Sequence, residues 1–152
     1  MKIERIGNTE QAKEIEALMQ EWSEALYEKD AELMAHYYSD DAKVYDLGTQ
    51  TETKEGYKNL WIKCFPYFAG NISVERQRVT IHAADGMGFL YGYSRVGGAQ
   101  TDNPAAEAWF RLTVCFQKIN DHWKVVHEHV SMPFDFELDK PALLMEVPEQ
   151  EA

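Results

Sequence analysis

The sequence predicts an α+β fold in one piece, because helical periodicity fills the first part of the chain and strand-like alternation fills the second. The clearest β signal is a pair of segments, 109–117 and 123–131, rich in aromatic and β-branched residues and separated by Asn120 and Asp121. We expect three N-terminal helices packed against a curved, mostly antiparallel sheet. This arrangement would be cone-shaped, with a pocket where the helices and the concave sheet face do not touch.

The first helix is predicted over residues 9–28, with Asn8 or Thr9 as its N-cap. Its apolar residues recur at the spacing of one buried stripe: Ile15, Leu18, Met19, Trp22 and Leu26. A second, short helix follows the capping residue Asp30. Its apolar side would consist of Leu33, Met34 and Tyr37.

A turn is expected at residues 39–41, followed by a strand over residues 42–47 that places Val44 and Asp46 on one face. Thr53 then caps a third helix that Pro66 ends. Beyond this helix the chain is predicted to be β. Residues 72–82 and 87–96 pair across a turn at residues 84–86, where Gly86 allows a positive φ.

Alternation assigns two faces to the hairpin 109–131. The face predicted to be buried carries Phe110, Leu112, Val114, Phe116, Val126, Glu128, Val130 and Met132. The outer face would carry Trp109, Arg111, Thr113, Trp123, His127 and His129. This outer set is apolar enough to suit a subunit interface better than water.

The charge and the apolar runs exclude several classes of protein. A formal charge of −11 over 152 residues argues against nucleic acid and anionic membrane surfaces as partners. No apolar run is long enough to cross a bilayer, and the N-terminus lacks the apolar core of a signal peptide, so we expect a cytoplasmic protein. Cys64 and Cys115 form no paired motif and are expected to be small buried hydrophobes.

One domain is expected over residues 1–135, followed by an acidic C-terminal arm over residues 136–152. Pro141, Pro148 and an acidic end indicate irregular structure in this arm. Its apolar residues 142–145 could pack on a neighbouring chain.

Two segments, 38–46 and 123–131, resemble the nuclear transport factor two-like superfamily, within it the SnoaL-like and ketosteroid isomerase-like proteins of cystatin-like fold. The resemblance covers residues 8–135. It implies that Asp46 matches the general base that moves a proton beside a carbonyl. The oxyanion donors of those isomerases match Trp22 and Leu112 here, and a tyrosine of their third helix matches Trp61, so the usual hydroxyl and carboxyl donors are replaced.

The spacing of His127, His129 and Ser131 also resembles the last strand of the association domain of calcium/calmodulin-dependent kinase two. That resemblance implies that Glu128 and Val130 face the pocket and that the two histidines face a partner subunit. Family members commonly dimerise through this outer sheet face, so a homodimer is expected. The two histidines have metal-ligand spacing, but no third ligand is evident, and no metal or cofactor is expected.

The candidate catalytic residues are Asp46 and Glu128, because a carboxyl group on a buried face gains proton affinity. The alternatives are a strand-end hydrogen bond for Asp46 and an ion pair with Arg95 or Arg111 for Glu128. The pocket walls, which would bind a small apolar ligand, are expected to be Trp22, Tyr57, Trp61, Phe110, Leu112 and Val130. The leading hypothesis is a cofactor-independent isomerase, cyclase or lyase acting on an apolar carbonyl compound. The alternative is a binding or dimerisation module without catalysis.

Overall fold

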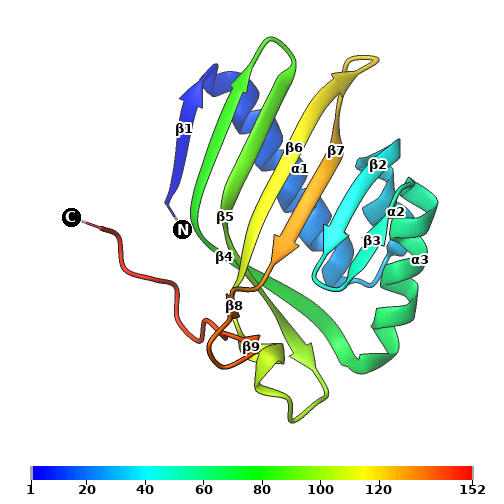
Figure 1. Cartoon of the computed structure of the whole chain (residues 1–152). Coiled ribbons are helices and arrows are strands. Elements are labelled where there is room, and N and C mark those ends of the chain that lie inside the picture. The colour runs from blue at the N-terminus through cyan, green and yellow to red at the C-terminus, as the bar shows by residue number, and fades with distance from the viewer. Residues whose placement is uncertain (1, 152) are drawn as a thin grey trace.

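The computed structural model describes residues 2–151 and shows an α+β architecture with one large sheet (Figure 1). Three α-helices are present: α1 (Thr9–Tyr27), α2 (Ala31–His36) and α3 (Lys54–Cys64). The strands are β1 (Ile3–Gly7), β2 (Tyr38–Asp46), β3 (Thr49–Thr51), β4 (Phe68–Ala84), β5 (Met87–Ala99), β6 (Phe110–Ile119), β7 (His122–Ser131), β8 (Phe134–Asp135) and β9 (Lys140–Pro141). Two short 3-10 helices are η1 (Phe65–Tyr67) and η2 (Pro104–Glu107).

The main sheet has seven strands in the order β1-β4-β5-β6-β7-β2-β3. Its central hairpins are antiparallel, as predicted, but β1 pairs with β4 and β2 pairs with β7 in parallel. The sheet is therefore mixed. The predicted succession of three helices at the N-terminus is only partly right, because β1 precedes α1, and β2 and β3 lie between α2 and α3.

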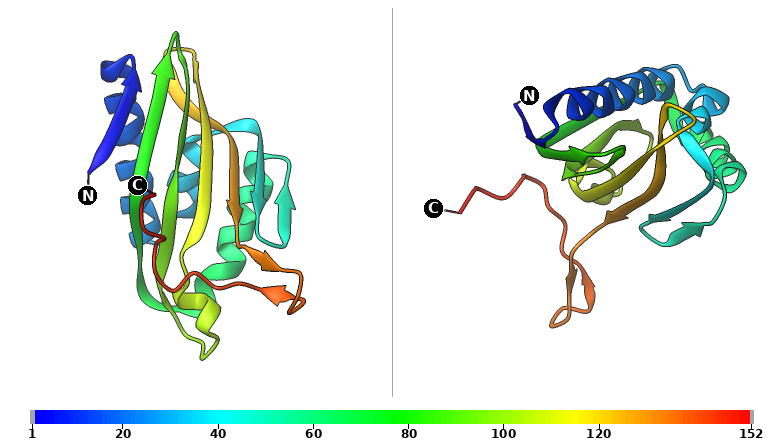
Figure 2. Two further views of the ribbon diagram at one scale, coloured as in Figure 1. Left: turned by 60° about the vertical axis from the view of Figure 1, so that its left-hand side comes forward. Right: turned by 90° about the horizontal axis from the view of Figure 1, so that it is seen from above.

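Helix α1 forms the second layer of the molecule. Its Asn8 cap accepts a hydrogen bond from the Gln11 amide, and its predicted apolar stripe lies buried against the sheet. Figure 2 shows α1 on one side of the sheet and the C-terminal segment on the other. The two faces of the sheet therefore have different partners, and the side toward α1 contains the hydrophobic core.

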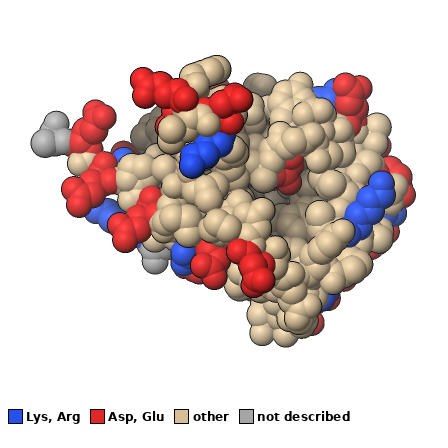
Figure 3. All heavy atoms as spheres, turned by 60° about the horizontal axis from the view of Figure 1, so that its bottom comes forward, with Lys and Arg blue, Asp and Glu red and all other residues tan. Residues whose placement is uncertain are grey.

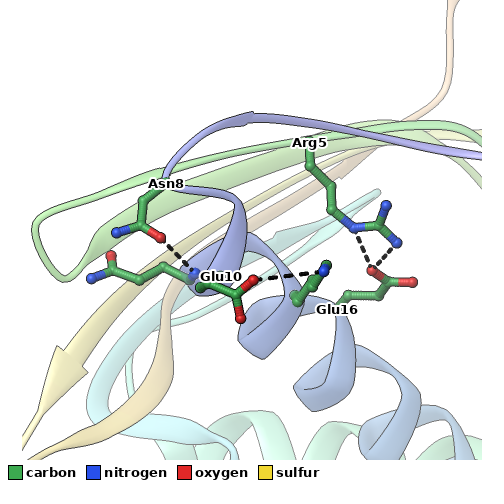
Figure 4. Close-up of polar contacts among 6 residues, drawn as sticks. Arg5, Asn8, Glu10 and Glu16 are labelled. Atoms are coloured by element: carbon green, nitrogen blue, oxygen red, sulfur yellow. Dashed lines mark hydrogen bonds and ion pairs between the residues drawn. The ribbon is translucent and has the colours of Figure 1, made fainter.

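Strand β1 was not predicted, because its five residues, Ile-Glu-Arg-Ile-Gly, are too few to show a clear strand alternation. It is attached to the layer beneath it by Arg5, whose Nε donates a 2.8 Å hydrogen bond to the Glu16 carboxylate of α1 (Figure 4). The strand covers only Val79–Ala83 of β4. The first half of β4 consequently has no neighbour on that side of the sheet.

The predicted turn at residues 39–41 is wrong, since β2 runs through it from Tyr38. The pairing of β2 with β7 is irregular between Tyr38 and Lys43, and the Asp40 and Asp41 side chains remain exposed there. Polar residues that usually signal a turn are thus accommodated in an irregular strand. In α2, Met34 is buried as expected, but Leu33 is 41% exposed.

The predicted alternation of β7 fails at a β-bulge. Cys115 of β6 pairs with His127, whereas the next residue, Phe116, pairs with Val125, so Val126 is the extra residue. The bulge reverses the phase of the first half of the strand. Trp123 and Val125, which were expected to face outward, are buried in the core, while Glu128 keeps its predicted inward position.

The expected outward exposure of Trp109 is also wrong. Its side chain is 3% exposed, its backbone N–H donates a 2.7 Å hydrogen bond to the Leu144 carbonyl, and the Arg95 guanidinium lies 4.6 Å from its ring centroid. The segment after residue 136 therefore covers part of the outer face of its own sheet. Within residues 2–151, no helix is both long and apolar enough to cross a lipid bilayer.

Candidate functional site

The two predicted acid residues lie on adjacent parallel strands. Asp46 is the last residue of β2 and pairs with Val130 of β7, and Glu128 pairs with Val44. Side chains two residues apart along a strand point to the same face. Since Val44 and Glu128 are both buried, the register places Asp46 and Glu128 as diagonal neighbours on the face that carries the core.

Glu128 is enclosed, with 8% of its surface exposed, and its carboxylate Oε1 accepts a 2.6 Å hydrogen bond from the Tyr38 hydroxyl. The pKa of Glu128 is raised to about 7, mainly by burial and to a smaller extent by the charge of Asp46. The hydrogen bond from Tyr38 and the charge of Arg76 act in the opposite direction. Glu128 can therefore hold or release a proton near neutral pH.

Asp46 is in a different environment. Burial alone raises the pKa of its carboxyl group, with no hydrogen bond contributing. Its charge in turn helps to raise the pKa of Cys64, after the larger effect of burial, so the last turn of α3 lies close to Asp46. A carboxylate with raised proton affinity and no hydrogen bond contributing to that shift is suited to accept a proton from a ligand.

An aromatic chain leads to Glu128 from the helices. The Trp22 indole N–H of α1 donates a 2.8 Å hydrogen bond to the Tyr57 hydroxyl of α3. The Tyr57 ring stacks on Tyr38 with centroids 4.0 Å apart, and the Tyr38 hydroxyl donates to Glu128. Trp61 contacts the chain through an edge-to-face arrangement with Trp22, at 6.2 Å between centroids.

The remaining predicted wall residues have different placements. Leu112 is buried and pairs with Val130, which in turn pairs with Asp46, so these three residues form one row across the sheet. Val130 and Phe110 are half-buried, and Phe110, the first residue of β6, pairs with Ser94 two positions before Leu112. Leu112 and Val130 thus lie in the row of Asp46, whereas Phe110 lies one position on the same face beyond that row.

At the end of the molecule where β2 and β7 finish, the surface is hollowed (Figures 1 and 3). Figure 3 shows mostly uncharged atoms around this hollow, with acidic atoms at its wall. A hollow with this lining suits a small, largely apolar molecule.

The proposed ion-pair partners of Glu128 are wrong. Arg95 bonds both carboxylate oxygens of Glu75 at 3.1 Å, and the Arg111 Nε donates to the Ser131 hydroxyl. The positive charge that acts on Glu128 belongs to Arg76 of β4. A signal for it was present in the sequence, because Arg76 follows Ile72 and Val74 at strand spacing and shares their inward phase.

Tyr38 was the second residue missed. The predicted turn placed it before the strand, and nothing in the sequence indicated that it would reach Glu128, which is 90 residues away in the chain. Parallel pairing of β2 with β7 makes this contact.

His127 and His129 of β7 contact other groups in the part of the chain described. His127 bonds the Lys43 carbonyl through Nδ1 at 2.7 Å, and both histidine rings lie edge-on to Tyr45. Within residues 2–151, no group of three His, Cys, Asp or Glu side chains could hold a metal ion. Both cysteines are free and half-buried.

Comparison with solved structures supports the fold assignment. An NTF2-like protein of unknown function from Pseudomonas putida is 28% identical, with a TM-score of 0.80 over 90% of this chain and 96% of that one. A protein of unknown function with a cystatin-like fold from Nostoc punctiforme is 15% identical, with a TM-score of 0.69 over 88% of this chain and 98% of that one.

A third similar structure belongs to a protein that is provisionally identified as an enzyme. It comes from Novosphingobium aromaticivorans, is provisionally identified as a scytalone dehydratase, and is 16% identical with a TM-score of 0.68 over 81% of this chain and 84% of that one. No curated protein matches the chain. The family model described as SnoaL-like domain matches residues 15–135, and the chain therefore belongs to the SnoaL-like domain family.

Proposed function

We propose that this protein is a cofactor-independent acid-base enzyme, an isomerase, cyclase or lyase that transfers protons on an apolar, carbonyl-bearing small molecule. The observation that carries the proposal is the pair Asp46 and Glu128. The two carboxyl groups lie on one face of adjacent strands, and the pKa of each is raised. Pairs of titratable groups tuned by their surroundings are typical of acid-base sites.

The two acids differ in their hydrogen bonding, which suggests different roles. Ionised Asp46 would take a proton from the carbon beside the substrate carbonyl, because its raised proton affinity favours that transfer. Glu128, with a pKa of about 7, is partly protonated at neutral pH and would give its proton to the enolate oxygen. Return of the first proton from Asp46 to another carbon, with the enol proton going back to Glu128, would complete an isomerisation. Loss of a leaving group from the enol, again with the oxygen-bound proton going back to Glu128, would complete an elimination.

The substrate would lie within the cone expected from the helices and the sheet. Trp22, Tyr57 and Trp61 from the helices and Leu112 and Val130 from the sheet would form its walls, with Phe110 farther along β6. The likeness to a provisionally identified scytalone dehydratase is compatible with the lyase form of the proposal.

Proton exchange in deuterated water tests this proposal. NMR would follow loss of the α-proton signal across a panel of enolisable ketones and ketoacids. We expect exchange with the native protein and a loss of about 100-fold or more in the Asp46→Asn variant, the scale of general-base catalysis. The matched control is Asp40→Asn on the same strand, because the Asp40 side chain is 95% exposed. Equal exchange in both variants would contradict the role of Asp46.

One observation favours a binding module over an enzyme. Trp22, Tyr57, Tyr38 and Glu128 satisfy one another by hydrogen bonds and stacking, which leaves few donors for an oxyanion. In that case the protein would hold a small apolar ligand without exchange. No exchange above buffer with any panel member, together with a retained ligand in the purified protein, would establish this alternative.

We also propose that the protein forms a homodimer through the outer sheet face. Residues exposed there include Phe89, Tyr91 and Tyr45. His82 stacks on Phe89 at 4.5 Å, and His127 meets Tyr45 at 4.9 Å, so aromatic groups occupy several neighbouring strands. Exposed aromatic side chains of this kind are typical of subunit interfaces. Trp109 and Trp123 take no part, since both are buried.

A further inference from the structure

Arg76 is a half-buried cation that forms no salt bridge among residues 2–151. Its Nη1 donates a 2.9 Å hydrogen bond to the Ser23 hydroxyl, and its guanidinium lies 5.6 Å from the Trp22 ring centroid. Its Nε is buried and has no hydrogen-bond partner. Burial lowers the pKa of Arg76 and the charge of Glu128 acts in the opposite direction, but no salt bridge within residues 2–151 holds the guanidinium.

Arg5 has a carboxylate partner on the Nε and Nη2 side of its guanidinium, which Arg76 does not have. Arg5 uses Nε and Nη2 together, and both donate to one carboxylate oxygen of Glu16, Oε2 (Figure 4). In Arg76 the same edge is free, because Ser23 occupies Nη1. The unfilled edge is therefore suited to one carboxylate group.

A cavity adjoins this arginine between α1 and the sheet. Its volume is about 450 Å³, and its lining includes Ile3, Lys13, Met19, Arg76, Val79 and Leu90. The apolar members come from the core, and Lys13 adds a second positive charge at the rim. Glu16, the acid in this lining, is already paired with Arg5.

A second cavity of about 400 Å³ also reaches Arg76, on the side of Ser23 and Tyr27. Its lining contains Glu24 and Glu28, which would repel an anion. Charge therefore favours the first cavity as the place for a negatively charged ligand.

We propose that the cavity between α1 and β4 binds a small apolar carboxylate whose charged group bonds the Nε and Nη2 edge of Arg76. The apolar part of the ligand lies on Met19, Val79 and Leu90. This site is distinct from the acid pair, because its lining contains neither Asp46 nor Glu128. The two sites are coupled through the charge of Arg76, which favours the ionised form of Glu128. An anion bound at Arg76 screens that charge and makes Glu128 hold its proton more tightly.

Hexanoate is the probe, and hexanamide, which has the same shape without the charge, is its control. Binding is measured from backbone amide shifts of residues 17–20 and 79–81. We expect saturable binding of hexanoate, and affinity at least about tenfold weaker for hexanamide and for the Arg76→Met variant, as the loss of a charge-assisted pair implies. Ala17→Trp should also weaken binding, because Ala17 lines the cavity and a larger side chain there would fill it. Ala17 is exposed and makes no hydrogen bond to the Arg76 guanidinium, so the substitution leaves that group in place.

The second variant keeps the test decisive if Arg76→Met does not fold. Absence of hexanoate binding to the native protein overturns the proposal, as does equal affinity for hexanoate and hexanamide. Unchanged binding in Ala17→Trp overturns it too. These outcomes are independent of proton exchange at Asp46, so the inference and the proposed function can fail separately.

Discussion

The pKa of Glu128 is set by opposing effects of burial and of the groups around its carboxyl group. Tyr38 donates the 2.6 Å hydrogen bond that favours the carboxylate, while burial and Asp46 favour the neutral acid. Burial dominates, so the pKa lies at about 7. A single buried carboxyl group thus becomes a proton donor and acceptor at neutral pH without a metal or a second hydrogen-bonded acid.

The raised pKa of Glu128 predicts a specific pH dependence of stability. Below about pH 4.5 both folded and unfolded forms carry the proton, so Glu128 has no effect. As pH rises toward about 7 the unfolded chain loses this proton while the folded protein keeps it, and the free energy of unfolding falls. The full cost, reached above about pH 7, is about 3 kcal/mol at 1.36 kcal/mol per pKa unit.

Glu128→Gln removes this titration and keeps an acceptor for Tyr38. Relative to the native protein, the variant should therefore gain about 3 kcal/mol of unfolding free energy between about pH 4.5 and pH 8. Urea denaturation at both pH values measures the difference, and Glu52→Gln, at an exposed position, controls for loss of one surface charge. A stability difference that does not change with pH would show that Glu128 is not buried as described.

At the scale of elements, the contact between α1 and the sheet positions Trp22. It requires a glycine at position 88 of β5, because a Cβ there would lie 2.7 Å from both the His82 carbonyl oxygen and the Ile15 side chain. Backbone cannot yield at such a distance without shifting the strand or the helix.

Gly88→Ala should accordingly destabilise the protein by about 1–3 kcal/mol, the usual cost of overpacking. Gly48→Ala is the matched control, since a Cβ at Gly48 would meet nothing within 4 Å. We expect that variant to stay within about 0.5 kcal/mol of the native protein. Chemical denaturation at pH 7 compares the two, and equal effects would contradict the close packing of α1 on β5.

Long elements could be predicted from the sequence because their signals are repeated. The buried stripe of α1 and the turns that join β4 to β5 and β6 to β7 are local and consistent along the chain. The bulge at Val126 has no local signature, and one extra residue was enough to reverse the predicted faces of Trp123 and Val125. Strand β1 has five residues, and its parallel partner is 76 residues away, since Ile3 pairs with Val79, so its own residues indicated a strand only weakly.

The candidate site was predicted unevenly for the same reason. Asp46 was proposed from the family resemblance, and Glu128 from its position between the apolar residues Val126 and Val130, which is a local feature of the sequence. Tyr38 and Arg76 act on Glu128 through parallel pairing and through the packing of α1 over β4, which are properties of the whole fold. Contacts of that kind follow only when the strand order is known.

At the scale of the whole molecule, the outer sheet face remains the surface available for self-association. Part of it is covered by the segment that reaches Trp109, but Phe89 and Tyr91 stay 42% and 43% exposed. Sedimentation at micromolar concentration should give twice the chain mass of 17.6 kDa.

A glutamate at the centre of this surface should separate the subunits, because burying an unpaired charge is costly. We expect Tyr91→Glu to sediment as a monomer. Tyr67→Glu, at a side chain that is 68% exposed on η1, should leave the dimer unchanged. A monomeric native protein would contradict the interface.

The central claim is that Glu128 titrates near neutral pH beside Asp46. Carboxyl ¹³C NMR of the native protein, with Glu128→Gln to assign the resonance, measures this directly. We expect a Glu128 resonance with a pKa of about 7, and an Asp46 pKa above that of an exposed aspartate. A Glu128 resonance that titrates like an exposed glutamate, near about pH 4.3, would contradict the claim and remove the basis for acid-base catalysis at this site.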